Sequence, residues 1–186
     1  MDIAAPLSVE VLGTHDVPAS ITWQVVTLMR CEWPSLFDGG LRWIDRPFDH
    51  DVDPVHLVVR HAGVLVSHAI VLRVPDDVHR TGLRLAGVAS VLTSPPHRGE
   101  GHASAVLHAA NQVLDGGDAD VAALFCEPQY EPFYARFGWV ACPGGTLEDD
   151  ELEPSTDLRM MRFLSDAGRA AQRRLLDVQL RVRWTW

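Results

Sequence analysis

The stretch PPHRGEGHA, residues 95–103, lies between two segments of different periodicity and decides the interpretation of the chain around it. The run before it, LRLAGVASVLTS (83–94), is typical of a strand, and its Gly87 indicates a bulge or a close backbone approach. After it, apolar residues recur at helical spacing and end at two glycines, which predicts a helix over 103–114. The stretch is therefore a glycine-rich turn between a strand and a helix.

A turn of this kind has two interpretations. Glycines allow the backbone to come close to a ligand, and the N–H groups in the first turn of the helix have no partner within the helix. Because a helix N-terminus carries about half a positive charge, these donors can bind a pyrophosphate, with Arg98 adding a charge-assisted contact. The alternative is an ordinary strand-to-helix turn without a ligand.

The composition excludes several classes of protein. All 16 basic side chains are arginine, and the absence of lysine excludes Schiff-base enzymes, pyridoxal phosphate enzymes and Walker A phosphate loops. A net charge of −9 argues against nucleic-acid binding and favours small or cationic partners.

Because 186 residues suit one core, we expect a single domain over 1–186. No membrane span and no signal-peptide pattern is seen, so we predict a cytoplasmic protein.

Cysteine and histidine give no sign of a structural metal or of disulfides. Cys31, Cys126 and Cys142 show no CxxC spacing, so we predict that they are buried free thiols. The nine histidines include no HExxH or comparable ligand cluster, so no metal is predicted.

The remaining segments alternate between strand and helix patterns. Helices are predicted over 17–32, 131–137 and 166–177, a hairpin over 55–60 and 63–74, a strand over 120–126 and extended structure over 139–142. The stretch 33–54 is irregular, with the character of a functional loop, and 148–153 is an acidic loop. The tail adds an apolar segment, 157–164, and an alternating one, 178–186.

Two motifs together resemble the GNAT acetyltransferase superfamily. Arg98-x-x-Gly101-x-Ala103 follows one strand, and FYARFGW (133–139) follows another about 30 residues later. The resemblance covers residues 55–141. It implies an α/β (α+β) fold with a central mixed, mostly antiparallel sheet, flanking helices and splayed strands at an acetyl-CoA site. It also implies that the protein binds acetyl-CoA as a cosubstrate, through these residues: Val91, Leu92, Thr93, Arg98, Gly99, Glu100, Gly101, His102, Ala103 and Ser104.

Tyr134 is the candidate catalytic acid by this resemblance. A phenol with a pKa near 10 can donate a hydrogen bond or a proton to the departing CoA sulfur. The alternative is a core tyrosine, because Phe133 and Phe137 indicate a packed segment. Glu127 and Glu131 lie nearby in the sequence and either carry a proton, bind substrate or are solvated acids at a helix start.

A narrower resemblance is to aminoglycoside 2′-N-acetyltransferases, carried by HLVVRHAGVLVSHAIVLR (56–73), residues 82–88, RGEGHASAVL (98–107), FYARFGW and Trp186. Two positions depart from that pattern. Ala89 stands where those enzymes carry a glutamate base, and Phe125-Cys126-Glu127 replaces a serine run. The base is therefore open: Glu127, an aspartate of 38–53 or the terminal carboxylate are the alternatives.

The predicted acceptor is a small cationic amine, first an aminoglycoside-type polyamine. Acidic loops focus negative potential that attracts cations, although such loops are most often only solvated. Asp38, Asp45 and Trp186 are the candidate substrate-binding residues. The alternatives are acetylation of a peptide or protein amine, and a non-catalytic acyl-CoA-binding module. A homodimer is compatible with each of them.

Overall fold

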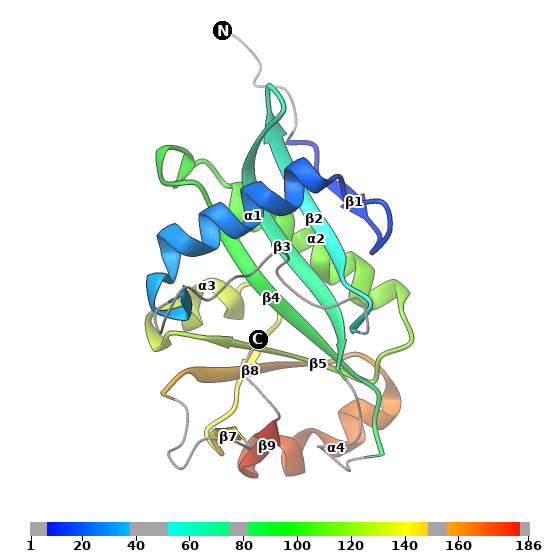
Figure 1. The fold of residues 1–186 in the computed structure, drawn as a ribbon. Helices are drawn as coiled ribbons and strands as arrows, with labels where there is room; N and C mark the ends of the chain where they lie inside the picture. The colour runs from blue at the N-terminus through cyan, green and yellow to red at the C-terminus, as the bar shows by residue number, and fades with distance from the viewer. Residues whose placement is uncertain (1–6, 38–51, 75–81, 149–155, 183–186) are drawn as a thin grey trace, which may run out of the picture. The chain divides into compact units, whose positions relative to one another are not determined.

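A computed structural model describes residues 7–37, 52–74, 82–148 and 156–182. The chain divides into two compact units, one comprising residues 1–71 and 90–110, the other residues 72–89 and 111–186. Strands β3 and β4 and helix α2 run through both units. The hydrogen-bonded strand order of the large sheet is β1-β2-β3-β4-β5-β8-β6, and β7 and β9 form a separate parallel pair (Figure 1).

The first unit contains an antiparallel meander with a helix packed on it. β2 pairs antiparallel with both β1 and β3, and the β2–β3 turn uses left-handed backbone at Ala62 and Gly63. The predicted hairpin is thereby confirmed. The elements are β1 (Glu10–Leu12), α1 (Ala19–Glu32), η1 (Pro34–Phe37), β2 (Val55–His61), β3 (Val64–Val74), β4 (Leu85–Thr93), η3 (Pro95–His97) and α2 (His102–Gly116).

Helix α1 forms because its apolar residues recur on one face, as the spacing predicts. Ile21, Val25 and Met29 are buried against Val58, Leu65 and Leu92 of the strands. Cys31 lies on the opposite, exposed side of α1, so the prediction that all three cysteines are buried is wrong for this one. Cys126 and Cys142 are buried, and all three thiols are free.

The second unit continues the sheet with mixed pairing. β4 pairs parallel with β5, and β8 pairs antiparallel with β5 and β6. With the antiparallel strands of the first unit, this is the mixed, mostly antiparallel sheet that was predicted. The elements are β5 (Val121–Cys126), η4 (Pro128–Tyr130), α3 (Glu131–Ala135), β6 (Val140–Ala141), β7 (Thr146–Glu148), β8 (Leu158–Phe163), α4 (Asp166–Asp177) and β9 (Leu180–Val182).

The parallel ladder between β4 and β5 is short. It joins Leu85–Gly87 to Val121–Ala123 and stops there, although β4 continues to Thr93 and β5 to Cys126. The splay of these strands at an acetyl-CoA site stays a prediction. Gly87 is the last residue of β4 in this ladder with β5, and the left-handed backbone of β4 lies at Ser90, with φ 47°. The bulge or close backbone approach expected at Gly87 stays a prediction.

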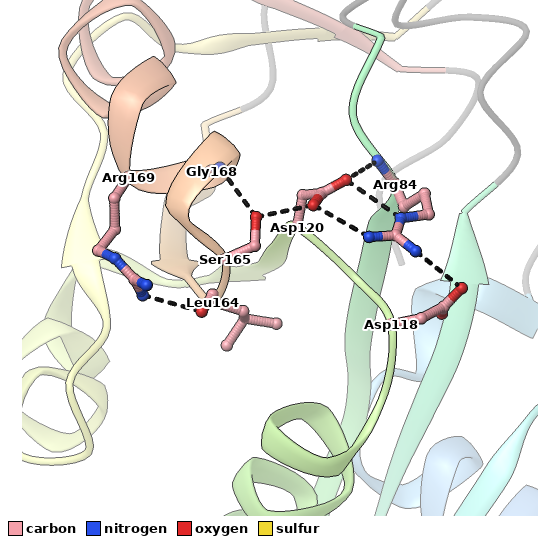
Figure 2. A network of polar contacts seen from close by, with 7 residues as sticks. All are labelled: Arg84, Asp118, Asp120, Leu164, Ser165, Gly168 and Arg169. Atoms are coloured by element: carbon pink, nitrogen blue, oxygen red, sulfur yellow. Dashed lines mark hydrogen bonds and ion pairs between the residues drawn. The ribbon is translucent and has the colours of Figure 1, made fainter.

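A polar network joins β4, β5 and α4 within the second unit (Figure 2). The Asp120 carboxylate accepts from the Arg84 backbone and guanidinium and from the Ser165 hydroxyl. Ser165 is also the N-cap of α4, where its Oγ accepts from the Gly168 N–H at 3.1 Å. The start of α4 is thus fixed by a buried aspartate at the start of β5.

Arg159 on β8 anchors the other end of α4. Its side chain is buried and donates to the carbonyls of Gly145, Leu175 and Val178 at 2.7, 2.9 and 2.9 Å. Its Nε has no hydrogen-bond partner among the described residues. The last carbonyls of a helix lack partners within the helix, so this arginine caps the C-terminal turn of α4.

Helices in the described ranges fall short of the length and apolarity that crossing a membrane requires.

Candidate functional site: the loop before helix α2 and the Tyr134 segment

The loop between β4 and α2 requires glycine at two positions for its conformation. Gly99 and Gly101 have φ values of 82° and 86°, a region that L side chains rarely adopt. A Cβ built on either glycine would meet nothing within 4 Å, so backbone conformation, and not lack of space, is the reason for glycine. The loop therefore presents its backbone without side chains at these two points.

The N-terminus of α2 follows directly on this loop. Ala105 N–H donates to the Gly101 carbonyl at 3.0 Å, an i to i−4 bond that starts the helical ladder. The first turn, which includes Ala103 and Ser104, contains no acidic residue, so no carboxylate of the helix itself opposes an anion at its end, and the Glu100 carboxylate lies in the loop just before it. This is the chemistry that a phosphate-binding loop needs.

Arg98 is held in place by two partners from its own unit. One guanidinium nitrogen, Nη2, lies 2.5 Å from Glu32 Oε2 at the end of α1, and Nε donates to the Thr93 carbonyl at 3.2 Å. The Arg98 side chain is still 52 % exposed. Glu32 was not found by sequence reasoning, since it lies 66 residues away in the chain and has no motif around it.

Two histidines surround the carboxylate in this loop. Glu100 Oε2 lies 3.1 Å from His102 Nε2 and 3.2 Å from His97 Nδ1. Hydrogen bonds from His102 and His97 lower the pKa of the Glu100 carboxyl. His102 is 9 % exposed, and its Nδ1 is buried without a partner among the described residues.

The end of β4 is held by the hydroxyl of Ser67 on β3. Ser67 Oγ donates to the Leu92 carbonyl at 2.7 Å and lies 2.9 Å from Thr93 Oγ1. Val91 is half-buried one residue after the left-handed Ser90. Val91, Leu92 and Thr93, which are predicted to pair with pantetheine, therefore lie in a short segment that is held by hydrogen bonds to Ser67.

A buried pair of histidines, His68 and His56, contacts the backbone of Ser90. His68 Nδ1 lies 3.2 Å from the Ser90 carbonyl, and His68 Nε2 lies 3.0 Å from His56 Nδ1. Because a carbonyl only accepts, His68 donates from Nδ1 and accepts on Nε2, so His56 donates from Nδ1. Burial lowers the pKa of His56 to about 4 and that of His68 to about 3. Sequence analysis did not identify this pair, which is formed by strand register.

Tyr134 is buried in the short helix α3. The residue is 8 % exposed, and its ring lies edge-on to that of Phe133, with ring centres 5.0 Å apart. Burial, with smaller contributions from Cys126 and Tyr130, raises the pKa of the phenol well above 10. The phenol is therefore protonated at neutral pH and available as a donor. Burial also raises the pKa of Cys126 to about 11, so this thiol is a poor nucleophile.

The two glutamates near Tyr134 in the sequence are exposed. Glu127 precedes the turn η4, and its Oε2 accepts from Gln129 Nε2 at 2.9 Å. Glu131 lies in the first turn of α3. Asp38, Asp45 and Trp186, the predicted substrate-binding residues, lie outside the described residues. Ala89 is buried on β4 and carries no titratable group.

The family model for the acetyltransferase (GNAT) domain matches residues 41–142. The chain belongs to the GNAT acetyltransferase domain family. This match contains both the glycine loop and the FYARFGW segment.

An aminoglycoside 2′-N-acetyltransferase from Mycolicibacterium fortuitum is 31 % identical to this GNAT chain over 110 residues, 59 % of the chain. The matched part spans only 55 % of that relative's length. An acyl-CoA N-acyltransferase from Pseudomonas aeruginosa has a similar structure, with a TM-score of 0.60, 19 % identity and coverage of 84 % of this chain and 99 % of that one. A GNAT family N-acetyltransferase from Escherichia coli, solved with CoA, gives a TM-score of 0.62 at 14 % identity, covering 98 % and 92 %. These two structures support the fold.

Proposed function

We propose that this protein transfers an acetyl group from acetyl-CoA to a primary amine of a small molecule. The observation that carries the proposal is the loop in which Gly99 and Gly101 are left-handed and lead into an α2 N-terminus free of acidic residues in its first turn. Such a loop offers backbone donors to a pyrophosphate, which explains how an acidic chain without lysine binds a highly anionic cofactor. Membership of the GNAT family supports the same cofactor.

The residues proposed to hold acetyl-CoA have separate roles. The backbone of Gly99 to Ser104 cradles the pyrophosphate, and Arg98 adds one cation whose position is set by Glu32. The backbone of Val91 to Thr93 pairs with the pantetheine arm. Glu100 and His102 take part through their N–H groups, because a carboxylate side chain would repel the phosphates.

The reaction is a direct transfer. The amine nitrogen attacks the thioester carbonyl, the new C–N bond forms as the C–S bond breaks, and CoA leaves as a thiolate. Tyr134 donates a hydrogen bond to that sulfur. A thiol has a pKa of about 8.5, well below that of the buried phenol, so the proton stays mainly on the tyrosine and the contact acts as electrostatic stabilisation. The proton lost by the attacking nitrogen goes to a base, for which Glu127 is our candidate.

An aminoglycoside-type polyamine is the first acceptor to examine. The support is the 31 % identity to an aminoglycoside 2′-N-acetyltransferase and the net charge of −9, which favours polycationic ligands. Asp38, Asp45 and Trp186 remain the candidates for binding it. We further propose a single catalytic domain.

The test is release of free CoA thiol from acetyl-CoA with three sets of amines: aminoglycosides, simple polyamines and peptides with free amines. We expect release above hydrolysis with aminoglycosides or polyamines. Turnover of peptides alone would reject a small-molecule acceptor and favour a peptide acetyltransferase. Tight CoA binding without release for any amine would contradict the enzymatic proposal and favour a non-catalytic acyl-CoA-binding module.

A further inference from the structure

Three side chains with metal-ligand atoms meet in the loop before α2. One nitrogen of His97, one oxygen of Glu100 and one nitrogen of His102 all lie within 4.8 Å of one another. The sequence predicts no metal because it lacks an established ligand motif, and the spacing 97, 100, 102 matches none. It is the left-handed backbone at Gly99 and Gly101 that turns these three side chains towards one point.

The distances within the cluster suit a tetrahedral divalent metal. Zn²⁺ binds nitrogen and carboxylate oxygen at about 2.0 to 2.2 Å, so two ligands of a tetrahedral site are about 3.3 Å apart. Glu100 Oε2 lies 3.2 Å from His97 Nδ1 and 3.1 Å from His102 Nε2. Two of the three ligand–ligand distances therefore already match a tetrahedral site, and the ligand nitrogens of His97 and His102 lie within 4.8 Å of each other.

We propose that His97, Glu100 and His102 form a binding site for an exchangeable divalent transition metal of the Zn²⁺ class. Three protein ligands leave the fourth tetrahedral position open. Ligating histidines usually donate their second nitrogen to a partner, which strengthens binding by about 10- to 100-fold, but the buried Nδ1 of His102 has no such partner among the described residues. The site is accordingly weaker than a structural zinc site and fills or empties with metal supply.

A metal ion at this position should strengthen the binding of acetyl-CoA, an inference that rests on the proposed function. Glu100 places a negative charge in a loop proposed to hold a pyrophosphate, and a divalent cation on that carboxylate reverses the local sign. Its open position also accepts a phosphate oxygen. Metal and CoA should therefore bind with positive coupling, each strengthening the other by the same factor.

The test of the site itself uses untagged, metal-free protein and Co²⁺ alone, without any CoA. We expect one Co²⁺ per chain with the visible absorption of a tetrahedral complex, and displacement by Zn²⁺. His97→Ala, Glu100→Gln and His102→Ala should each weaken Co²⁺ binding by at least about tenfold. His108→Ala, which removes an exposed histidine from the same helix, should leave Co²⁺ binding unchanged.

Absence of tetrahedral Co²⁺ absorption in the wild-type protein would overturn the proposal. So would equal Co²⁺ binding by the wild-type and Glu100→Gln proteins. Since Glu100 is exposed, Glu100→Gln is the variant that best preserves the fold.

The coupling between metal and CoA is measured separately, as the Kd for CoA with and without Zn²⁺. A tightening of about fivefold or more in wild type and none in Glu100→Gln is expected. CoA binding without that difference would reject the coupling alone, and failure of CoA to bind would reject the proposed function while leaving the Co²⁺ result standing.

Discussion

Asp120 binds both the backbone and the side chain of Arg84. Its Oδ2 accepts from the Arg84 N–H at 2.9 Å and from Nε at 3.2 Å, and its Oδ1 accepts from Nη2 at 3.2 Å (Figure 2). These bonds lower the pKa of the aspartate, and the Ser165 hydroxyl adds a further bond at 2.7 Å. Asp120 thereby ties β4 and the start of α4 to β5.

Replacing this carboxylate should destabilise the protein. We expect Asp120→Ala to reduce the free energy of unfolding by about 2 to 3 kcal/mol, because it removes several charge-assisted hydrogen bonds and leaves part-buried donors unpaired. Arg84→Ala should have less than half this effect, since the Arg84 side chain is 58 % exposed and its backbone bond to Asp120 remains. Urea unfolding of both variants measures the difference. Equal losses would contradict the prediction, because they would mean that the Arg84 side chain accounts for the whole contribution of the Asp120 carboxylate.

Gly168 is a second position where this junction tolerates no change. A Cβ at Gly168 would lie 2.0 Å from the Asp120 carbonyl oxygen, which is backbone and cannot rotate away. Gly168→Ala should therefore cost about 3 kcal/mol of unfolding free energy despite the better helix propensity of alanine. Gly116→Ala is the matched control, because a Cβ there meets nothing within 4 Å, and it should be neutral or slightly stabilising in thermal melts. A tolerated Gly168→Ala would contradict the close packing of α4 on β5.

The buried pair His56 and His68 should make stability depend on pH. Burial lowers their pKa values to about 4 and about 3, whereas an unfolded histidine has a pKa of about 6.5. Below pH 6.5 the unfolded state binds more protons, so stability falls as the pH decreases, by up to about 1.4 kcal/mol per pH unit for each histidine. Urea unfolding between pH 7 and pH 4.5 measures the slope.

The double variant His56→Leu/His68→Leu should have a flatter slope over the same pH range. A double variant that keeps the full pH dependence would assign it to other groups.

Tyr134 and Tyr130 are the two tyrosines of the chain and provide a matched comparison. If Tyr134 donates to the leaving thiolate, Tyr134→Phe should lower kcat by about 100-fold or more while changing the Kd for CoA little. Tyr130 is 44 % exposed, and Tyr130→Phe should leave kcat near wild type. Because burial raises the pKa of Tyr134, kcat should show no loss from ionisation of this phenol up to pH 9. A wild-type kcat for Tyr134→Phe would assign the tyrosine to the core alone.

Arg98 should contribute to cofactor affinity. A charge-assisted hydrogen bond is worth about 1.5 to 3 kcal/mol, so Arg98→Ala should weaken CoA binding by about 10- to 100-fold, measured by calorimetry. Arg169→Ala is the control, since Arg169 is also about half exposed and paired with a carboxylate, that of Asp166. If both variants bind CoA equally well, the pyrophosphate is held by backbone donors without help from arginine.

Much of the fold follows from local pattern. The 3.6-residue spacing of apolar side chains gives α1 and α2, and β-branched runs around His61 to Gly63 give the first hairpin. The same patterns do not predict which residues of two neighbouring strands lie opposite each other. The contact between His56 and His68 arises because β2 and β3 pair with Val58 opposite His68, and no local signal encodes that choice.

The site shows the same division. The glycine loop and Tyr134 are recognisable because two short motifs carry them in a fixed order along the chain. Glu32 beside Arg98 and the meeting of His97 with His102 depend on tertiary placement and on left-handed glycine backbone. The left-handed backbone of β4 lies at Ser90, whose carbonyl accepts from His68, and no local pattern marks that position.

Arg159 is a position at which arginine does what lysine could not do as well. Its guanidinium reaches carbonyls on two stretches far apart in sequence, the turn at Gly145 and the end of α4. A planar fork can serve several acceptors in one plane at once, which the ammonium of lysine does less well, and it keeps its charge at any pH that a protein meets. If the last turn of α4 unfolds, the buried Arg159 guanidinium loses its carbonyl partners there. Because the same guanidinium also binds the Gly145 carbonyl, this turn and the turn before β7 should open together as one cooperative unit.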